Sequence, residues 1–289
     1  MTAYEVPGSK AWMQCLRGIA SRRERHQDLR EEFRELLRYR ELLYMIVYRD
    51  IKVRYKQSVM GMLWAVLMPT LIVMAGVVIR YGYSLVAHSQ FKTTDIASVA
   101  VKSLPWAFLV SSIRFSCNSL IGNPNLVTKV YFPKEIFPLA AVLASLFDFF
   151  VASAALLILL LVIQVGWSVY LLWVPVLLVA MVILATGVGM VVSAASLFFR
   201  DVKYIVEVLL TFGIFFTPVF YDVSMFGDKG KWLLLNPVAP ILDGLSSCIA
   251  RRQSPDLPWL AYACCFGLVT LLAGYAFFKH LEAGFAESI

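Results

Sequence analysis

The sequence lacks the short motifs that mark nucleotide-hydrolysing enzymes and the common hydrolases. It contains no Walker A glycine loop, no Gly-x-Ser-x-Gly elbow and no His-Glu-x-x-His motif. Its three histidines are scattered and its five cysteines have no paired spacing, so neither a metal site nor a disulfide framework is expected. The chain is therefore expected to have no catalytic centre, no metal and no cofactor of its own, and not to hydrolyse ATP.

Charged residues are also scarce for a chain of 289 residues. Only 16% are charged, whereas 60% are hydrophobic and the mean hydropathy is +0.74, as is typical of a polytopic protein with one membrane domain. The net charge of +7 does not indicate nucleic acid as a partner, because the cations crowd at the ends of apolar runs. The first apolar run starts near residue 60, so no cleavable signal peptide is expected.

The first long apolar run sets the expected topology. The uncharged residues from Gly61 to Ile79 would form a helix of roughly 28 Å, close to the hydrocarbon thickness of a bilayer. Because Lys and Arg accumulate on the cytoplasmic side, residues before Gly61 are expected inside and those after Arg80 outside. The cations that precede the run are Arg40, Arg49, Lys52, Arg54 and Lys56.

Six apolar runs are expected to cross the membrane, which predicts an all-α membrane protein. The second run is polar, but the cations Lys129 and Lys134 in the short loop after it belong inside, and this requires a crossing. In the fourth run, Gly187 and Gly189 start a small-residue face suited to close helix packing. The expected spans are residues 61–83, 104–122, 139–165, 170–199, 205–221 and 259–278, with both termini in the cytoplasm.

The N-terminal part predicts a helix that lies on a surface. From residue 17 to 56, apolar positions recur at three- and four-residue steps among many charges. One interpretation is an interfacial helix on the lipids of the cytoplasmic leaflet, which also contacts a partner subunit; the other is a solvated charged helix without a binding role. The predicted division is residues 1–57 for the tail and this helix, and residues 58–289 for the six-span domain. The interfacial residues would include Arg49, Asp50, Lys52, Arg54, Tyr55 and Lys56.

Two ionisable residues are expected near the middle of the membrane. Counting about 1.5 Å per residue along the second and third spans places Arg114 and Asp148 at similar depth, where they are expected to pair. The alternative is that Asp148 is neutral and hydrogen-bonded while Arg114 faces water. Glu207 follows Lys203 by four residues, which favours a local ion pair.

Three segments resemble one family of membrane proteins. The run RDIKVRYKQSVMGMLWAVLMP, from Arg49 to Pro69, is similar to the start of the membrane subunits of type-2 ABC exporters, in particular those that export O antigen or wall teichoic acid. Residues 123–138, NPNLVTKVYFPKEIFP, resemble the coupling helix that docks on the ATPase subunit in that family, and residues 199–203 resemble a third motif. Without the resemblance, residues 123–138 would be an ordinary amphipathic connection between two spans. The implied coupling residues are Asn123, Leu126, Lys129, Val130, Tyr131, Phe132, Pro133 and Lys134.

The resemblance implies the permease subunit of an ATP-driven exporter of a lipid-linked polysaccharide. It implies a homodimer in the bacterial inner membrane, joined by two copies of a P-loop ATPase that bind ATP and Mg, and a re-entrant helical segment between spans five and six. Aromatic residues near the outer ends would be lipid anchors or would stack on sugars along a translocation path. The alternatives are an exporter of a drug or small lipid, a stand-alone carrier, or a glycan-modifying enzyme. The candidate path residues are Tyr81, Tyr83, Trp106, Phe108, Arg114, Phe215, Phe216, Phe220 and Tyr221.

Overall fold

A computed structural model describes residues 34, 36–56, 60–86, 88 and 90–285. Throughout these residues the secondary structure is helical, without a β-strand, which confirms the predicted all-α class. The chain divides into two compact units, residues 1–41 and 42–289, and the helices discussed below lie in the second unit or lead into it. The predicted tail, the first half of the predicted interfacial helix and the predicted domain boundary after residue 57 lie outside the described residues.

Five of the described helices are long and apolar enough to cross a membrane. They correspond to the first, second, third, fourth and sixth predicted spans, and most bounds agree within a few residues. Together they make this an integral membrane protein. The five helices are α4 (Leu63–Val86), α5 (Thr93–Ser119), α7 (Ile136–Val162), α8 (Val174–Phe198, preceded by the short helix η1, Val169–Trp173) and α11 (Leu257–Glu282).

Helix α5 lies at the centre of the bundle and begins eleven residues before the predicted start of the second span. The Asp95 carboxylate accepts a hydrogen bond from the backbone N–H of Lys92 at 2.9 Å, which fixes the first turn. Most of α5 is buried against α7, α8, α4 and α10. Lys102, predicted in an outer loop, is therefore inside this buried helix.

Helix α9 (Val202–Phe216) is shorter than the predicted fifth span, 205–221. Its fifteen residues rise about 22 Å, which is shorter than the hydrocarbon core of a bilayer, so α9 is not one of the five helices long enough to cross a membrane. The helix stops at Thr217, which has an extended backbone (φ −115°, ψ 136°). Pro218 follows, and a residue before proline is disfavoured in the helical conformation.

A bent helical segment lies between α9 and α11. It consists of η2 (Val223–Leu235), α10 (Val238–Ser246) and the π-helical turn η3 (Ser247–Arg251). Within it, Lys229–Leu235 and Val238–Arg251 meet at an angle of 114° on either side of Asn236 and Pro237, and these two parts would make a sixth candidate span only if they are taken together as one broken span. Helix α10 is buried against α5 and α8.

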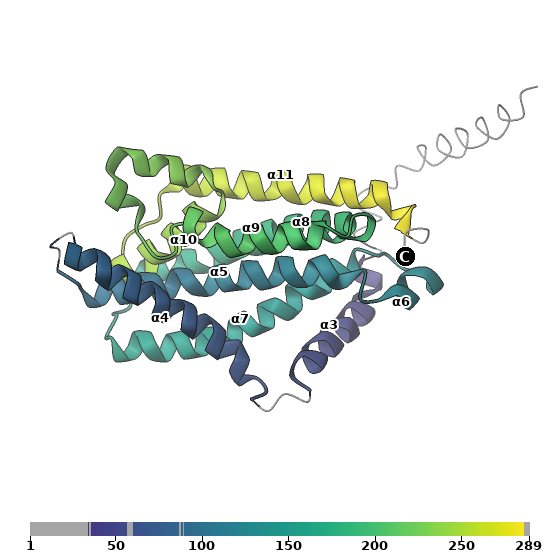
Figure 1. Cartoon of the computed structure of the whole chain (residues 1–289), viewed down its shortest axis with the longest axis horizontal. Helices are drawn as coiled ribbons and strands as arrows, with labels where there is room; N and C mark the ends of the chain where they lie inside the picture. The colour runs from purple at the N-terminus through teal and green to yellow at the C-terminus, as the bar shows by residue number, and fades with distance from the viewer. Residues whose placement is uncertain (1–33, 35, 57–59, 87, 89, 286–289) are drawn as a thin grey trace, which may run out of the picture. The chain divides into compact units, whose positions relative to one another are not determined.

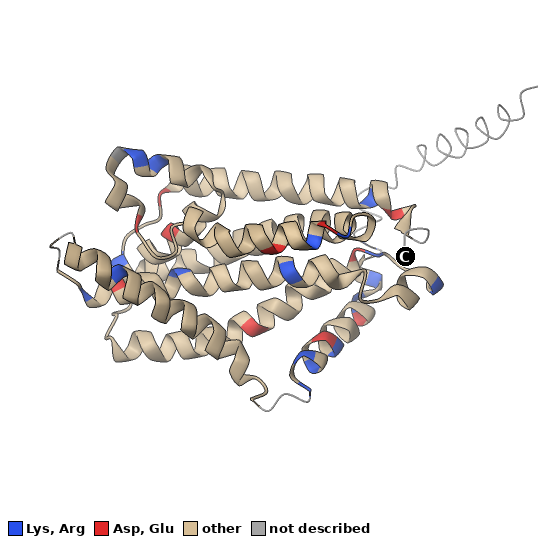
Figure 2. Cartoon of the chain, in the orientation of Figure 1, with Lys and Arg blue, Asp and Glu red and all other residues tan. Residues whose placement is uncertain are grey.

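The bundle of residues 42–289 has two ends, called here the α6 end and the α10 end (Figure 1). The short helix α6 (Pro124–Lys129) lies at the first, together with the last turns of α11. Helix α3 (Arg40–Tyr55) lies beside the bundle toward the same end, and α4 runs from its flank toward the α10 end. Many charged residues lie near the two ends and along α3, a few lie within α5, α7 and α9, and the long middle part of α11 carries none (Figure 2).

Helices α8 and α11 approach so closely that their backbones touch. A Cβ at Gly187 would lie 2.6 Å from the backbone nitrogen of Leu271, and a Cβ at Gly274 would lie 2.5 Å from the carbonyl oxygen of Gly187. Two rows of small residues are what permits such close packing in membranes. The predicted packing role of Gly187 is confirmed.

Candidate functional site

The segment at the α6 end has one face inside the protein and one face outside. Phe132 is 4% exposed and packs against Phe137, with 5.5 Å between the ring centroids. The Phe132 ring also contacts the Lys134 ammonium, which lies 4.6 Å from the ring centre. Tyr131, in contrast, is 92% exposed. The buried ring of Phe132 thus fixes the segment in place while the ring of Tyr131 projects into the surroundings, where a partner protein could contact it.

The other predicted coupling residues occupy both faces of this segment. Asn123 is half-buried and donates from its amide to the carbonyl oxygen of Ser119 at 2.8 Å, which ties α6 to the end of α5. Leu126 is also half-buried, Pro133 is buried, and Lys129 and Val130 are exposed.

Sequence reasoning missed the residue that joins this segment to α11. Glu135 is buried, and its carboxylate lies 2.5 Å from the Lys279 ammonium, which also contacts Glu282 at 3.0 Å. Burial raises the pKa of the Glu135 carboxyl, against the opposing effect of Lys279. The sequence carries no signal for this contact, because no local pattern pairs two residues 144 positions apart.

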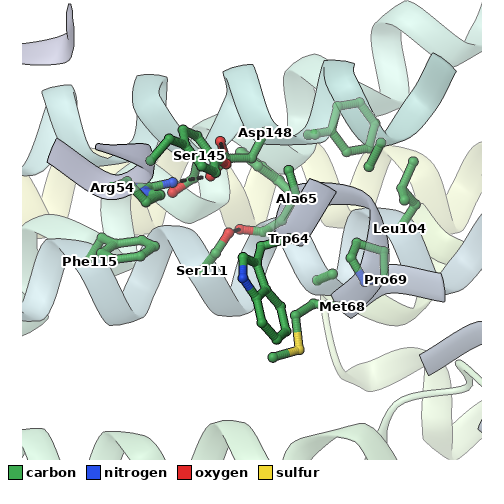
Figure 3. Close-up of a pocket in the computed structure, with 15 residues that line it drawn as sticks. Arg54, Trp64, Ala65, Met68, Pro69, Leu104, Ser111, Phe115, Ser145 and Asp148 are labelled. Carbon is green, nitrogen blue, oxygen red and sulfur yellow. Dashed lines mark hydrogen bonds and ion pairs between the residues drawn. The ribbon is translucent and has the colours of Figure 1, made fainter. Parts of the chain in front are cut away.

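The predicted ion pair between Arg114 and Asp148 is wrong. Asp148 instead accepts hydrogen bonds from the Arg54 guanidinium and the Tyr55 hydroxyl at the end of α3. The Arg54 guanidinium also lies over the Phe115 ring, 3.7 Å from its centre. Figure 3 shows Arg54 and Asp148 at one end of a cavity, with Pro69 and Leu104 at the other. Helix α3 is thereby fastened to the middle of α7.

Arg114 pairs with Glu207 rather than with Asp148. The guanidinium makes two hydrogen bonds to the carboxylate, of 2.9 and 2.6 Å, between α5 and α9. This two-point geometry is the strong form of an Arg–carboxylate contact. It also replaces the predicted local pair of Glu207 with Lys203. Both side chains are about half exposed, at 45% and 51%, so the pair faces outward from the single chain.

The predicted interfacial residues of α3 are only partly engaged with the rest of the protein. Arg49 contacts its neighbour Asp50 at 2.8 Å, and the Lys52 ammonium lies 5.6 Å from the Tyr48 ring. Lys56 is exposed, while Arg54 and Tyr55 make the contact with Asp148. The interfacial role of this helix stays a prediction.

The candidate path aromatics differ in burial and form three groups. Trp106, Phe108 and Phe220 are buried; Phe108 packs edge to face on Phe149, and Trp106 lies over Gly213 of α9. These three fill the core of the single chain. Tyr221 is half-buried, and its hydroxyl donates to the Phe215 carbonyl at 2.9 Å. The exposed members are Tyr81, Tyr83, Phe215 and Phe216.

Asp222 lies at the centre of a network of six charged residues near the α10 end. Its carboxylate contacts Lys102 at 2.7 Å and both Arg80 and Arg251 at 2.9 Å. Burial would raise the pKa of Asp222, but the three cations outweigh it and hold that pKa well below its usual range. Arg80 also contacts Asp95 at 2.8 Å, and Arg251 contacts Asp243 at 3.0 Å. The network joins α4, α5, α10 and η3 to the turn after α9.

Known proteins resemble this chain along most of its length. Residues 41–249 match the family described as ABC-2 type transporter. The O-antigen export system permease protein RfbA of Myxococcus xanthus is 29% identical over 260 residues, which cover 89% of this chain and 98% of that protein. A protein of the same name from Klebsiella pneumoniae is 27% identical over 249 residues, covering 86% of this chain and 94% of its own length. The family match covers well over half of the sequence and extends from α3 to η3, so the chain belongs to the membrane proteins of the ABC-2 type transporter family.

Proposed function

We propose that the chain is the permease subunit of an ATP-driven exporter of a lipid-linked polysaccharide of the O-antigen type. The observation that carries this proposal is the near full-length similarity to two proteins named O-antigen export system permeases. The working unit would be a homodimer in the bacterial inner membrane. Two copies of a separate P-loop ATPase would bind ATP and Mg, since this sequence lacks a Walker A loop.

The α6 end supports a partner of this kind. The buried ring of Phe132 and the ion pair between Glu135 and Lys279 hold the segment firmly, while Tyr131 projects outward. A rigid segment with one protruding aromatic can transmit a push from a soluble subunit into α5 and α7, which it connects. We therefore assign the ATPase to this end and the cytoplasm to its surroundings.

The surface between α5 and α9 supports a path between two copies of the chain. A half-exposed ion pair on a membrane helix belongs next to water or protein rather than lipid. Arg114 and Glu207 occupy such a position, and the exposed Phe215 and Phe216 follow along α9. In this proposal α9 is a short fifth span that faces the second copy, and the bent segment from η2 to η3 is re-entrant from the outer surface.

The docking of the ATPase is tested by replacing Tyr131 with Ala. An exposed aromatic anchor at an interface contributes about 2 kcal/mol or more, so capture of the ATPase by the solubilised permease is expected to fall by ~30-fold. Export of polymer to the cell surface is expected to fall with it. The matched control is Trp167→Ala, which removes an exposed aromatic residue beside η1, away from α6. Unchanged capture and export for both Tyr131→Ala and Phe132→Ala would contradict the assignment.

The orientation is tested by labelling single cysteines in a cysteine-free chain in intact cells. Cysteines at Gln90, Trp167 and Lys229 are expected to react with an impermeant maleimide, because positive-inside topology places them outside. Cysteines at Lys129 and Lys203 are expected to react only after the membrane is opened. All five positions are exposed, so access to the reagent rather than burial decides the result. Labelling of Lys129 in sealed cells would reverse the orientation.

A further inference from the structure

Helix α11 runs the length of the bundle, from the bent segment to the α6 end (Figure 1). It begins soon after η3, and its last turns lie near α6. Proline occurs only in its first turn, so the interior of the helix has no proline hinge. The contacts at the two ends of α11 are therefore joined by one stiff element.

At the α6 end, α11 is tied to the segment that carries Tyr131 and Phe132. The Oε1 atom of Glu135 lies 2.5 Å from the Lys279 ammonium, and its Oε2 atom has no hydrogen-bond partner among the described residues. Glu135 is 1% exposed, so the ammonium compensates a carboxylate that lies away from water. Separating the two groups would leave that carboxylate alone, so a movement of the segment carries the end of α11 with it.

At the other end, α11 is tied to the bent segment. The Tyr262 hydroxyl donates a hydrogen bond of 2.8 Å to the carbonyl oxygen of Leu235, immediately before the bend. Helix α10, beyond the bend, also packs against α11. Tyr262 and Lys279 lie about 26 Å apart along the helix axis. One helix thus contacts the bent segment at one end of the bundle and the docking segment at the other.

Between these two ends, α11 lies against α8. The backbones of the two helices touch at Gly187 and Gly274, which present no side chains. A contact between glycines does not interlock the helices, so α11 can shift along α8 by about 1–2 Å, the usual size of helix shifts in switching proteins.

We propose that α11 relays the movement of the ATPase from the segment at the α6 end to the bent segment, with Glu135, Lys279 and Tyr262 as positioning residues. The inference rests on the proposed function and adds to it the connection by which a cytoplasmic event reaches the outer surface. The two links act in series, because a relay that is broken at either end transmits nothing.

The first test compares polymer at the cell surface with ATP hydrolysis by the purified permease–ATPase complex. Glu135→Gln and Tyr262→Phe are each expected to lower the ratio of export to hydrolysis at least ~3-fold. Lys279→Arg should restore most of the export that Lys279→Met removes. The matched control is Glu282→Gln, which removes the other carboxylate on Lys279, at 3.0 Å, and leaves the contact with Glu135 in place.

The double variant Glu135→Gln/Tyr262→Phe tests the serial arrangement. Its ratio of export to hydrolysis should be no lower than that of the worse single variant, whereas independent roles would multiply the two losses. Tyr262→Phe removes one hydroxyl at the end remote from the ATPase, so it keeps the test valid if Glu135→Gln fails to fold. Losses that multiply would overturn the relay.

A second measurement follows the bent segment directly, in the permease–ATPase complex in nanodiscs. A single cysteine at the exposed Lys229 of η2 is labelled with a maleimide, with and without trapping by ADP and vanadate. The labelling rate is expected to change at least ~3-fold on trapping. Glu135→Gln and Tyr262→Phe should abolish this change, whereas Glu282→Gln should keep it.

Two results of the labelling experiment would overturn the relay. One is a rate in the parent chain that does not respond to trapping, and the other is an equal response in the parent and in both link variants. Either result leaves the proposed function in place. Export that is unaffected by deleting the permease rejects the proposed function itself.

Discussion

Asp222→Asn is expected to lower the stability of the protein more than any other single change in the charge network at the α10 end. Lys102 is 1% exposed, and without Asp222 its closest remaining partner is the carbonyl oxygen of Tyr221 at 2.7 Å. Removing one member of a buried ion pair costs about 3–5 kcal/mol, because the other charge is left uncompensated. We therefore expect a large fall in the thermal unfolding temperature in detergent.

The reciprocal change is expected to cost less. Lys102→Met removes the most deeply buried charge, and Asp222 then keeps Arg80 and Arg251, both at 2.9 Å. The double variant Lys102→Met/Asp222→Asn should lose less stability than the sum of the two single variants. Asp201→Asn, an exposed change at the α6 end, serves as the control and should stay within about 0.5 kcal/mol of the parent. Equal losses for Asp222→Asn and Lys102→Met would show that Lys102 has adequate alternative partners.

The second large effect is expected at the contact between α8 and α11. Gly187→Leu should yield little folded protein, because even its Cβ would overlap the backbone of Leu271 and force the two helices apart. Gly187→Ala should fold with a stability lowered by about 1–3 kcal/mol, the usual cost of overpacking. Gly274→Ala should behave in the same way, since its Cβ would meet the Gly187 carbonyl from the opposite helix.

The control is a helical glycine with open space around it. A Cβ at Gly82 in α4 meets no atom within 4 Å among the described residues, so Gly82→Ala should be neutral or slightly stabilising. Recovery of monodisperse protein by gel filtration and thermal unfolding in detergent are the measurements. A Gly187→Leu chain as stable as Gly82→Ala would mean that α8 and α11 do not pack at this distance.

Long apolar runs made most of the fold predictable. The first span was predicted at 61–83 and α4 is Leu63–Val86; the third was predicted at 139–165 and α7 is Ile136–Val162. These limits follow from local composition, because a lipid-facing helix has to be apolar over its whole length. The family resemblance drawn from the motifs near Arg49 and Asn123 is likewise confirmed by the match to ABC-2 type transporters.

The predictions were wrong for charged residues whose partners lie far away in the sequence. The predicted second span began at residue 104 because Lys102 carries a charge. The helix α5 nevertheless begins at Thr93, since the carboxylate of Asp222 compensates the charge of Lys102. Because α5 begins earlier than predicted, Arg114 lies closer to the α6 end than predicted, and there it pairs with Glu207 instead of Asp148. Arg54 was placed on the membrane surface with the other α3 cations, and no local pattern showed that it would reach the middle of α7.

The distance in sequence between Lys102 and Asp222 has a consequence for biosynthesis. The two residues are 120 positions apart, so at common rates of translation the ribosome makes Asp222 roughly 6–24 s after Lys102. During that interval Lys102 lacks the carboxylate that it has in the finished protein, while Arg80 and Asp95, only 15 positions apart, can already pair. A nascent chain therefore carries an ammonium without its carboxylate partner until its later half emerges, and a product that ends between the two residues is expected to be less stable in the membrane than the full chain.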